Sequence, residues 1–286
     1  MAAGRGCLLV VGTPIGNLGD LTPRAADALR TADLVVAEDT RFAARLLRHV
    51  GTRTPTSSLN EHNAAERLPG LLARLAAGET LALTTDAGMP GVSDPGARLV
   101  EAARAAGAAV EVVPGPSAVT AAMALSGIGS PGFVFGGFLP ARPASSRRAA
   151  LQRLLAGSGA MGLPLVLFEA PHRVRSLLAE LSSVAPAASV ALCRELTKLH
   201  EEVLTGTPAE VASALTEPRG EFTVVIGGIA ASDAAGAPVN AAALAAAAIR
   251  AGVPPRTIVE LLRAAGMPRR AAYRAVPTAD DGPAPS

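Results

Sequence analysis

The stretch TTDAGMPGVSDPG, residues 84–96, decides the fold of this chain. It follows the apolar, strand-like run 81–83 and precedes the helix-like run 97–106. Its three glycines, two prolines and two aspartates exclude a regular element, so we expect a stiff turn that brings backbone close to another group. Such loops at strand ends are where α/β sheets bind ligands. The alternative is an elaborate strand-to-helix connection without a ligand.

Short apolar strands alternate with helices on both sides of this loop. We predict strands at 8–11, 34–37, 80–83 and 110–113. We predict helices at 22–31, 40–50, 64–76, 97–106 and 117–125. This alternation is typical of a mostly parallel sheet covered on both faces. The sequence therefore predicts an N-terminal α/β domain over residues 1–127.

The pattern changes after the Gly/Pro cluster 127–132. We predict strands at 133–139, 163–168, 190–193, 202–205 and 222–226, with helices at 146–155, 174–181 and 209–215. This order favours a mixed α+β second domain over 128–229. A small-residue linker, 230–238, and helices at 241–250, 256–264 and 269–274 form a C-terminal helical extension over 230–276. Residues 277–286 are predicted to be a disordered tail.

Composition describes an ordinary globular protein. The 286 residues are 49% hydrophobic and 17% charged, with a net charge of +2. Lys198 is the only lysine, so the basic side chains are nearly all arginine, which suits phosphate recognition and permits a nucleic-acid partner. Two isolated cysteines indicate a reducing compartment. Because no apolar run is long enough for a signal peptide or a membrane span, we expect a cytoplasmic protein without membrane contact.

Two more loops follow strands in the first half. The loop GTPIGN, 12–17, occupies the position of a dinucleotide fingerprint but lacks its glycine spacing, and Pro14 removes a backbone donor. These features argue against nicotinamide enzymes and nucleoside triphosphatases. The loop PGPSA, 114–118, leads into a helix, where Ser117 is either a cap or a ligand contact. Together with 84–96, these loops outline one cleft.

A charged cluster, Glu38-Asp39-Thr40-Arg41, follows the second predicted strand. Two acids and an arginine at a carboxyl edge are typical of a general base with a phosphate or substrate clamp. The alternative is that Asp39 or Thr40 caps the next helix. No metal is predicted, because the histidines show no ligand spacing. They are His49, His62, His172 and His200.

These motifs, in this order, resemble the tetrapyrrole methylase superfamily of S-adenosylmethionine-dependent methyltransferases. Within it, the chain is similar to the ribosomal RNA small subunit methyltransferase I family. The resemblance covers about residues 7–228. Its most specific segments are VGTPIGNLGDLT at 11–22, AEDTR at 37–41, residues 86–96, FEAPHR at 168–173 and RELTK at 194–198.

The resemblance implies a class III methyltransferase fold of two α/β domains, with S-adenosylmethionine bound between them, and a homodimer. It implies 2′-O-methylation of a cytidine ribose in the decoding region of 16S rRNA, within the small ribosomal subunit. Cofactor contacts carry over by position from both domains. They fall on Pro14, Ala87, Gly88, Met89, Val92, Ser117, Ala118, Glu169 and Leu196.

A ribose hydroxyl is a weak acid, so its methylation needs a base or a cation that stabilises the alkoxide. The base candidates are Glu38 first, then Asp39 and His62, whereas Lys198 and Arg41 are candidates for stabilising the alkoxide or gripping phosphates. The segment 142–148 is predicted to be a mobile basic loop over the cleft. The candidate RNA contacts are Arg24, Arg41, Arg147, Arg148 and Arg173.

Arginines of the C-terminal helices either extend the RNA footprint or form a solvated helix face. They are Arg256, Arg263, Arg269, Arg270 and Arg274. Because only Tyr273 and six phenylalanines are aromatic, we expect base stacking to be minor.

Two other functions remain open from the sequence: methylation of a tetrapyrrole small molecule, and non-catalytic binding of RNA or the ribosome. The arginine-rich periphery favours RNA over a tetrapyrrole. The acids beside an intact cofactor loop argue against a non-catalytic protein.

Overall fold

The fold is described from a computed structural model, which describes residues 6–92, 96–229, 245, 248–249, 253–264 and 267–276. Residues 1–229 and 230–286 form two separate compact units, and each is described by itself. The predicted linker 230–238, most of the predicted helix 241–250 and the predicted tail 277–286 lie outside the described residues. No described helix is long and apolar enough to cross a membrane.

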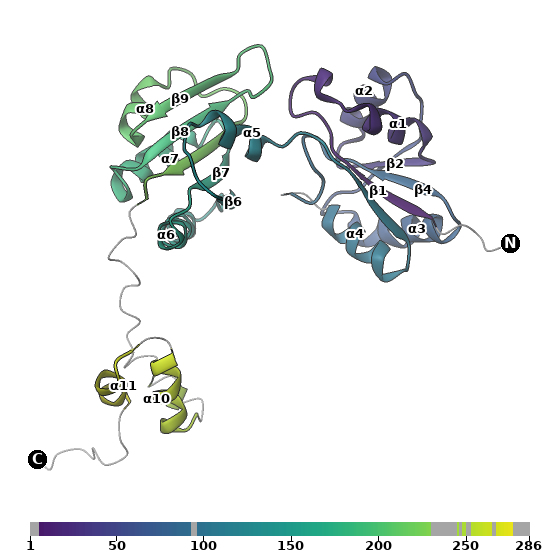
Figure 1. Ribbon diagram of the computed structural model, residues 1–286. Coiled ribbons are helices and arrows are strands. Elements are labelled where there is room, and N and C mark those ends of the chain that lie inside the picture. The colour runs from purple at the N-terminus through teal and green to yellow at the C-terminus, as the bar shows by residue number, and fades with distance from the viewer. Residues whose placement is uncertain are drawn as a thin grey trace, which may run out of the picture. The chain divides into compact units, whose positions relative to one another are not determined.

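The first sheet of the larger unit is parallel throughout (Figure 1). Its strands, in spatial order, are β3 (Thr56–Ser58), β2 (Leu34–Ala37), β4 (Thr80–Leu83), β1 (Cys7–Val11) and β5 (Ala109–Val113). Helices cover both faces because successive strands need crossovers that pack back onto the sheet. They are η1 (Leu18–Asp20), α1 (Pro23–Thr31), α2 (Thr40–His49), α3 (Ala64–Ala76) and α4 (Gly96–Ala105).

Two hydrophobic layers hold these helices in place. On one face, α1 and α2 bury Leu29 and Leu46 against β2 and β4. On the other face, α3 and α4 bury Leu71 and Leu99 against β1, β2 and β4 (Figure 1). The helices begin where the sequence places caps: Thr22 accepts a hydrogen bond from the backbone N–H of Ala25 at 3.1 Å, with Pro23 at the first helical position.

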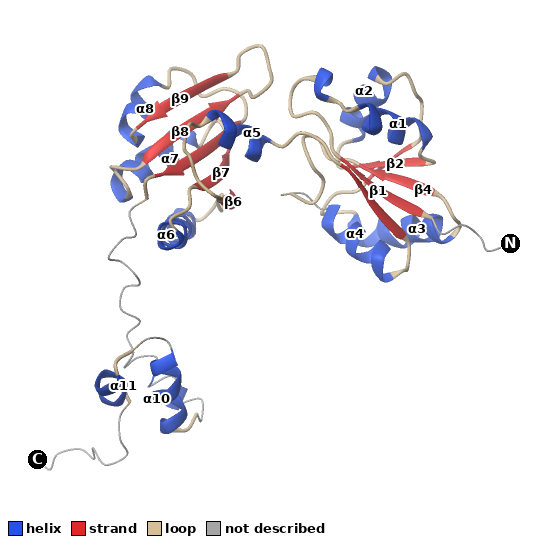
Figure 2. Ribbon diagram, in the orientation of Figure 1, coloured by secondary structure: helices blue, strands red, loops and turns tan. Residues whose placement is uncertain are grey.

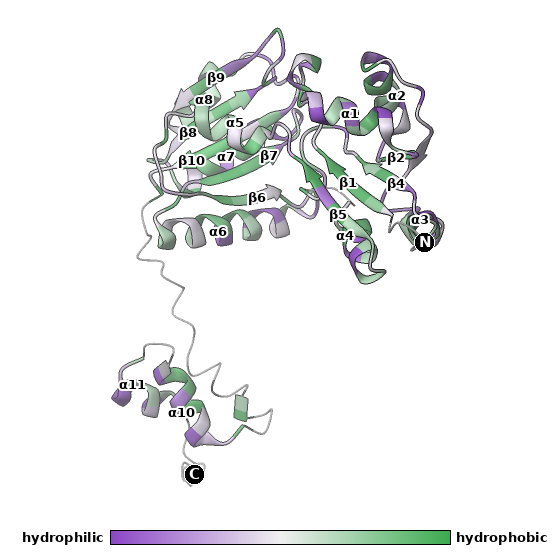
Figure 3. Ribbon diagram, turned by 45° about the vertical axis from the view of Figure 1, so that its right-hand side comes forward, coloured by the Kyte–Doolittle hydropathy of each residue, from purple (hydrophilic) through white to green (hydrophobic). Residues whose placement is uncertain are grey.

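The second sheet is mixed (Figure 2). Its spatial order is β6 (Val134–Phe138), β7 (Leu165–Glu169), β10 (Phe222–Gly227), β8 (Ser189–Arg194) and β9 (Glu202–Gly206). Among the strand pairs that the structure describes in this sheet, only β6 and β7 are parallel, and the others are antiparallel. The helices of this half are α5 (Ala118–Leu125), α6 (Ala144–Met161), α7 (Val174–Val184) and α8 (Pro208–Ala214). The central strands are hydrophobic, as the green ribbons in Figure 3 show.

The predicted fold class is confirmed: a parallel α/β half is followed by a mixed half. Three details differ from the sequence predictions. The strand β3 was not predicted, because it is a short, polar edge strand without an apolar run. Helix α5, expected in the N-terminal domain, packs Val119 and Ala122 on the second sheet. Helix α6 begins at Ala144 and continues to Met161, beyond both ends of the predicted helix 146–155.

The smaller unit contains α10 (Pro255–Ala264) and α11 (Arg269–Ala275), close to two of the predicted helices. Their apolar side chains form a small core of their own, with Ile258 and Ala272 buried.

Candidate functional site

The three glycine- and proline-rich loops meet at the carboxyl edge of the first sheet. The backbone N–H of Thr13 donates to the carbonyl of Gly88 at 2.9 Å, and the N–H of Gly88 donates back at 3.2 Å. The hydroxyl of Thr13 donates to the carbonyl of Thr85 at 3.1 Å. A Cβ added to Gly12 would lie 2.6 Å from the Cα of Gly115, so these backbones touch and only glycine fits. The loops therefore form one rigid assembly.

A pocket of about 370 Å³ opens beside these loops, a size suited to a small cofactor. It takes residues from both sheets of the larger unit. They are Ile15, Glu38, Thr85, Ala87, Gly88, Met89, Val92, Ser117, Ala118, Phe138, Phe168, Glu169, Ala170, Pro171, Leu196, Glu221, Phe222 and Thr223.

The pocket has a buried floor and an exposed mouth. Its floor includes Ile15, Thr85, Leu196 and Thr223, all buried. The exposed lining residues mark its mouth. They are Glu38, Ala87, Val92, Phe138 and Glu221. The buried lining thus combines apolar side chains with two threonines and Glu169, whereas the mouth carries two exposed carboxylates.

The pocket brings together the proposed cofactor residues with one exception. Pro14 is buried in the first loop and does not line the pocket, where its neighbour Ile15 takes that place. Ser117 occupies the N-cap position of α5, but its side chain makes no capping hydrogen bond and it lines the pocket instead. The capping alternative for Ser117 thus finds no hydrogen bond in the structure, and the ligand contact stays a prediction.

Sequence reasoning missed Phe222 and Thr223, at the start of β10. These residues reach the pocket because β10 runs antiparallel to β7, which places Phe222 opposite Glu169. The sequence prediction considered only residues that follow the carboxyl end of a strand, whereas Phe222 and Thr223 lie at the amino end of β10. Their place in the pocket depends on the direction of β10. The motif FEAPHR did carry the signal for Phe168, Ala170 and Pro171, which adjoin Glu169.

The segment around Leu196 is strained. Glu195 and Thr197 have positive φ angles of 51° and 66°, which side-chain-bearing residues adopt only when their surroundings enforce them. Lys198 supplies part of that constraint, because its Nζ lies 3.0 Å from Glu195 Oε1 and 3.2 Å from Glu221 Oε2. A Cβ on Gly16 would meet Lys198 Cγ at 2.6 Å, so the first loop presses directly on this segment. These contacts hold Leu196, which lies between the two strained residues, in the pocket floor.

Lys198 does not line the pocket itself, but it contacts Glu221, which does. Burial disfavours the charged form of Lys198. Hydrogen bonds and attraction to Glu195 and Glu221 outweigh that effect and raise the pKa of the ammonium. Lys198 therefore stays cationic near neutral pH.

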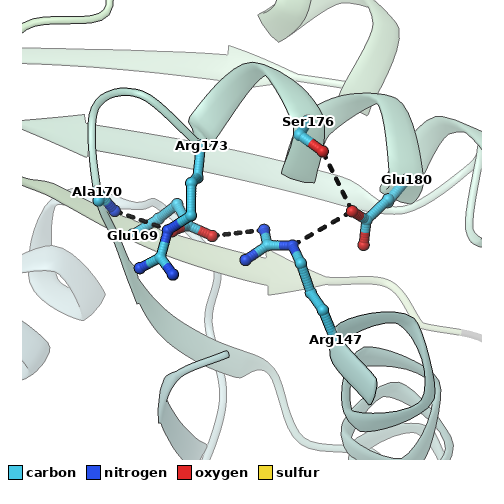
Figure 4. Close-up of polar contacts among 6 residues, drawn as sticks. All are labelled: Arg147, Glu169, Ala170, Arg173, Ser176 and Glu180. Atoms are coloured by element: carbon cyan, nitrogen blue, oxygen red, sulfur yellow. Dashed lines mark hydrogen bonds and ion pairs between the residues drawn. The ribbon is translucent and has the colours of Figure 1, made fainter. Parts of the chain in front are cut away.

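Glu169 is the centre of a buried ion-pair network (Figure 4). Its Oε2 accepts a hydrogen bond from Arg147 Nη2 at 2.6 Å, and its Oε1 lies 2.9 Å from Arg173 Nε. Its Oε1 also accepts from the backbone N–H of Ala170 at 2.9 Å. Arg147 Nε donates to Glu180 Oε1 at 3.2 Å, so one guanidinium joins β7 to α7. This network fixes the end of β7 where it enters the pocket wall.

Two sequence predictions are wrong at this point. Arg147 is 5% exposed and held by two carboxylates, so it is not free to bind RNA. The segment 142–148 is not a mobile loop over the cleft, because α6 begins at Ala144. The side chain of Arg173 is 21% exposed and forms an ion pair with Glu169, so little of it is open to RNA.

The candidate bases differ in their surroundings. Glu38 lines the mouth of the pocket. Asp39 caps α2, accepting from the backbone N–H of Arg41, and the Arg41 guanidinium holds the pKa of Asp39 at about 2. A carboxylate with so low a pKa is a poor proton acceptor at neutral pH. His62 is exposed and does not line the pocket. The capping alternative thus accounts for Asp39, and of the three candidates only Glu38 lines the pocket.

Asp86 is a further polar residue that sequence reasoning did not select. Its Oδ1 accepts a hydrogen bond from the backbone N–H of Asp39 at 3.2 Å, which ties the β4 loop to the β2 loop. Partial burial raises the pKa of Asp86. This residue positions the Glu38 segment against the loop 84–92.

The remaining predicted RNA contacts lie on the surface. Arg24 on α1 and Arg148 on α6 are exposed. Arg41 is 90% exposed along its side chain although it is paired with Asp39.

The fold and the pocket define a methyltransferase of the tetrapyrrole methylase class. The family model described as Tetrapyrrole (Corrin/Porphyrin) Methylases matches residues 8–212. Ribosomal RNA small subunit methyltransferase I from Xylella fastidiosa is 42% identical over 274 residues, covering 94% of this chain and 98% of the relative. The Thermotoga maritima protein of the same name is 43% identical over 225 residues, covering 78% and 99%. The chain therefore belongs to the ribosomal RNA small subunit methyltransferase I family.

Solved structures support the fold. Cobalt precorrin-4 methyltransferase superposes with a TM-score of 0.58 at 15% identity, covering 79% of this chain and 95% of that structure. Diphthine synthase superposes with a TM-score of 0.59 at 16% identity, covering 78% and 90%.

The cofactor of this family is S-adenosylmethionine, and the pocket suits it. The buried apolar side chains of Ile15 and Leu196 fit an adenosine ring.

Proposed function

We propose that this protein uses S-adenosylmethionine to methylate the 2′-hydroxyl of a cytidine ribose in the decoding region of 16S rRNA. The observation that carries the proposal is the position of Glu38, an exposed carboxylate at the mouth of a pocket that suits the cofactor. The names of the relatives support rRNA of the small subunit as the substrate.

Glu38 is assigned the role of general base. S-adenosylmethionine supplies an activated methyl group on its sulfonium. A ribose hydroxyl is a weak acid, so Glu38 would accept its proton while the methyl group passes from the sulfonium to the oxygen and a neutral thioether is left. The rigid loops would hold the two reactants in a fixed arrangement, and the buried lining would exclude water that competes as a nucleophile.

Lys198 is assigned to the substrate side of the mouth. Its ammonium stays protonated between Glu195 and Glu221, so its assigned role is to hold this side of the mouth in place. Exposed arginines at Arg24, Arg41 and Arg148 are assigned to phosphates of the RNA. We propose that the substrate is the assembled small subunit in the cytoplasm and that the enzyme acts as a homodimer.

The test uses Glu38→Gln and isolated small ribosomal subunits with radiolabelled S-adenosylmethionine. Turnover should fall by about 10²–10⁴-fold, the usual contribution of a general base. Cofactor affinity, measured by calorimetry, should stay within about twofold because the amide preserves the shape of the side chain. His62→Gln is the matched control, since His62 is exposed and outside the pocket. Unchanged turnover in Glu38→Gln would place the base elsewhere.

A further inference from the structure

Phe138 is an exposed aromatic ring at the mouth of the pocket. It ends β6, lines the pocket and is 53% exposed. The chain has no tryptophan and only six phenylalanines, of which Phe135, Phe138 and Phe168 gather here. An apolar ring left open to water beside a ligand pocket indicates a contact surface.

A β-bulge brings these rings together. The register between β6 and β7 shifts between Phe135 and Gly137, where Gly137 has a φ of 62°. Positions 135 and 138 are three residues apart, so in a regular strand they would face opposite sides of the sheet; the bulge leaves one residue between them unpaired. With it, Phe135 and Phe138 both pack on Phe168, with ring centroids 5.0 Å and 5.4 Å away. The bulge thus directs Phe138 to the pocket side.

We infer that Phe138 stacks on the base of the nucleotide whose ribose is methylated. This inference rests on the proposed function, since it names the contact that holds the target nucleotide. The ribose hydroxyl must reach Glu38, which shares the mouth with Phe138. The base attached to that ribose therefore lies at the mouth too. Among the described residues that mark the mouth, Phe138 is the aromatic one.

The cofactor is a less suitable partner for this ring. A cofactor held in the buried floor contacts residues such as Ile15 and Leu196, whereas more than half of the Phe138 surface stays open to solvent. Enzymes that modify a nucleotide commonly take it out of its stack and hold its base against aromatic side chains. Phe138 would replace the stacking that the target base loses, which revises the expectation that aromatic stacking is minor.

The test compares three variants of the full chain in methyl transfer to isolated small subunits. Phe138→Leu removes the aromatic face, and Phe138→Tyr keeps it. Phe133→Leu is the matched control, because Phe133 is 37% exposed just before β6 and does not line the pocket. Stacking on one base corresponds to about a 5- to 150-fold change in affinity.

We expect Phe138→Leu to raise the KM for small subunits by that factor while the Kd for S-adenosylmethionine stays unchanged. Phe138→Tyr and Phe133→Leu should both remain close to the natural protein. A raised cofactor Kd with an unchanged KM for subunits would overturn the inference and show that the Phe138 ring contacts the cofactor instead. Equal KM values for Phe138→Leu and Phe133→Leu would also overturn it. If the unaltered chain transfers no methyl group to subunits, the proposed function itself fails.

Discussion

Replacing Arg147 by methionine should destabilise the larger unit strongly, although the sequence alone predicts an exposed arginine at this position. The side chain of Arg147 is 6% exposed and that of its partner Glu169 is fully buried. Removing the guanidinium leaves Glu169 with Arg173 and one backbone N–H, and it also breaks the contact with Glu180 (Figure 4).

Breaking a buried ion pair by removing one partner costs about 3–5 kcal/mol, because the remaining charge stays buried with less compensation than before. For a unit of this size, each kcal/mol lowers Tm by about 2–4 °C. The melting temperature of Arg147→Met should therefore fall by roughly 6–20 °C. Because Glu169 lines the pocket, cofactor affinity should fall as well.

Thermal unfolding followed by circular dichroism measures this effect, and Arg148→Met is the matched control. Arg148 is the next residue on α6 and is exposed, so its replacement should change stability by no more than about 0.5 kcal/mol. Arg147→Lys should fall between the two variants, since one ammonium lacks the fork that reaches both carboxylates. Equal melting temperatures for Arg147→Met and Arg148→Met would refute the assigned network.

Three further predictions address the loops, the cap and the RNA surface. Gly12→Ala should weaken cofactor binding at least tenfold, as measured by calorimetry, because the added Cβ would lie 2.6 Å from neighbouring backbone. An unchanged Kd would contradict the close contact between the two loops. Asp39→Asn keeps a capping residue but loses the ion pair with arginine. Since folding lowers the pKa of Asp39 to about 2, its stabilisation is present above about pH 4 and disappears as pH falls toward 2. Urea unfolding should show the variant less stable at pH 7 with the difference closing in acid, and a constant difference would count against the pairing. Replacing the exposed arginines Arg24 on α1 and Arg41 on α2 by glutamine should reduce the salt dependence of small-subunit binding, whereas Arg98→Gln on α4, on the opposite face of the sheet, should not.

The sequence predicted the elements well where apolar periodicity was clear. The helix 64–76 matches the structure because its buried positions have helical spacing, and the strands 34–37 and 80–83 match because they are short, nearly continuous buried runs. The three strand-end loops were found from glycine and proline alone. The strand β3 was missed because a polar edge strand depends on its neighbour β2 rather than on its own sequence.

The roles of charged residues were harder to predict. Arg147 and Arg148 look alike in the sequence, yet Arg147 lies on the buried stripe of α6 with Leu151 and Leu155. That four-residue spacing was available in the sequence, but the carboxylates that accept the guanidinium come from β7 and α7. Phe138 was not predicted because the alternation of apolar and polar residues does not reveal the β-bulge that turns its side chain toward the pocket.

Methyl transfer from labelled S-adenosylmethionine to isolated small ribosomal subunits, followed by digestion and nucleoside mapping, tests the proposed activity directly. We expect the label on the ribose of a cytidine in 16S rRNA, as 2′-O-methylcytidine. Label on a base, or no label in the rRNA, would contradict it.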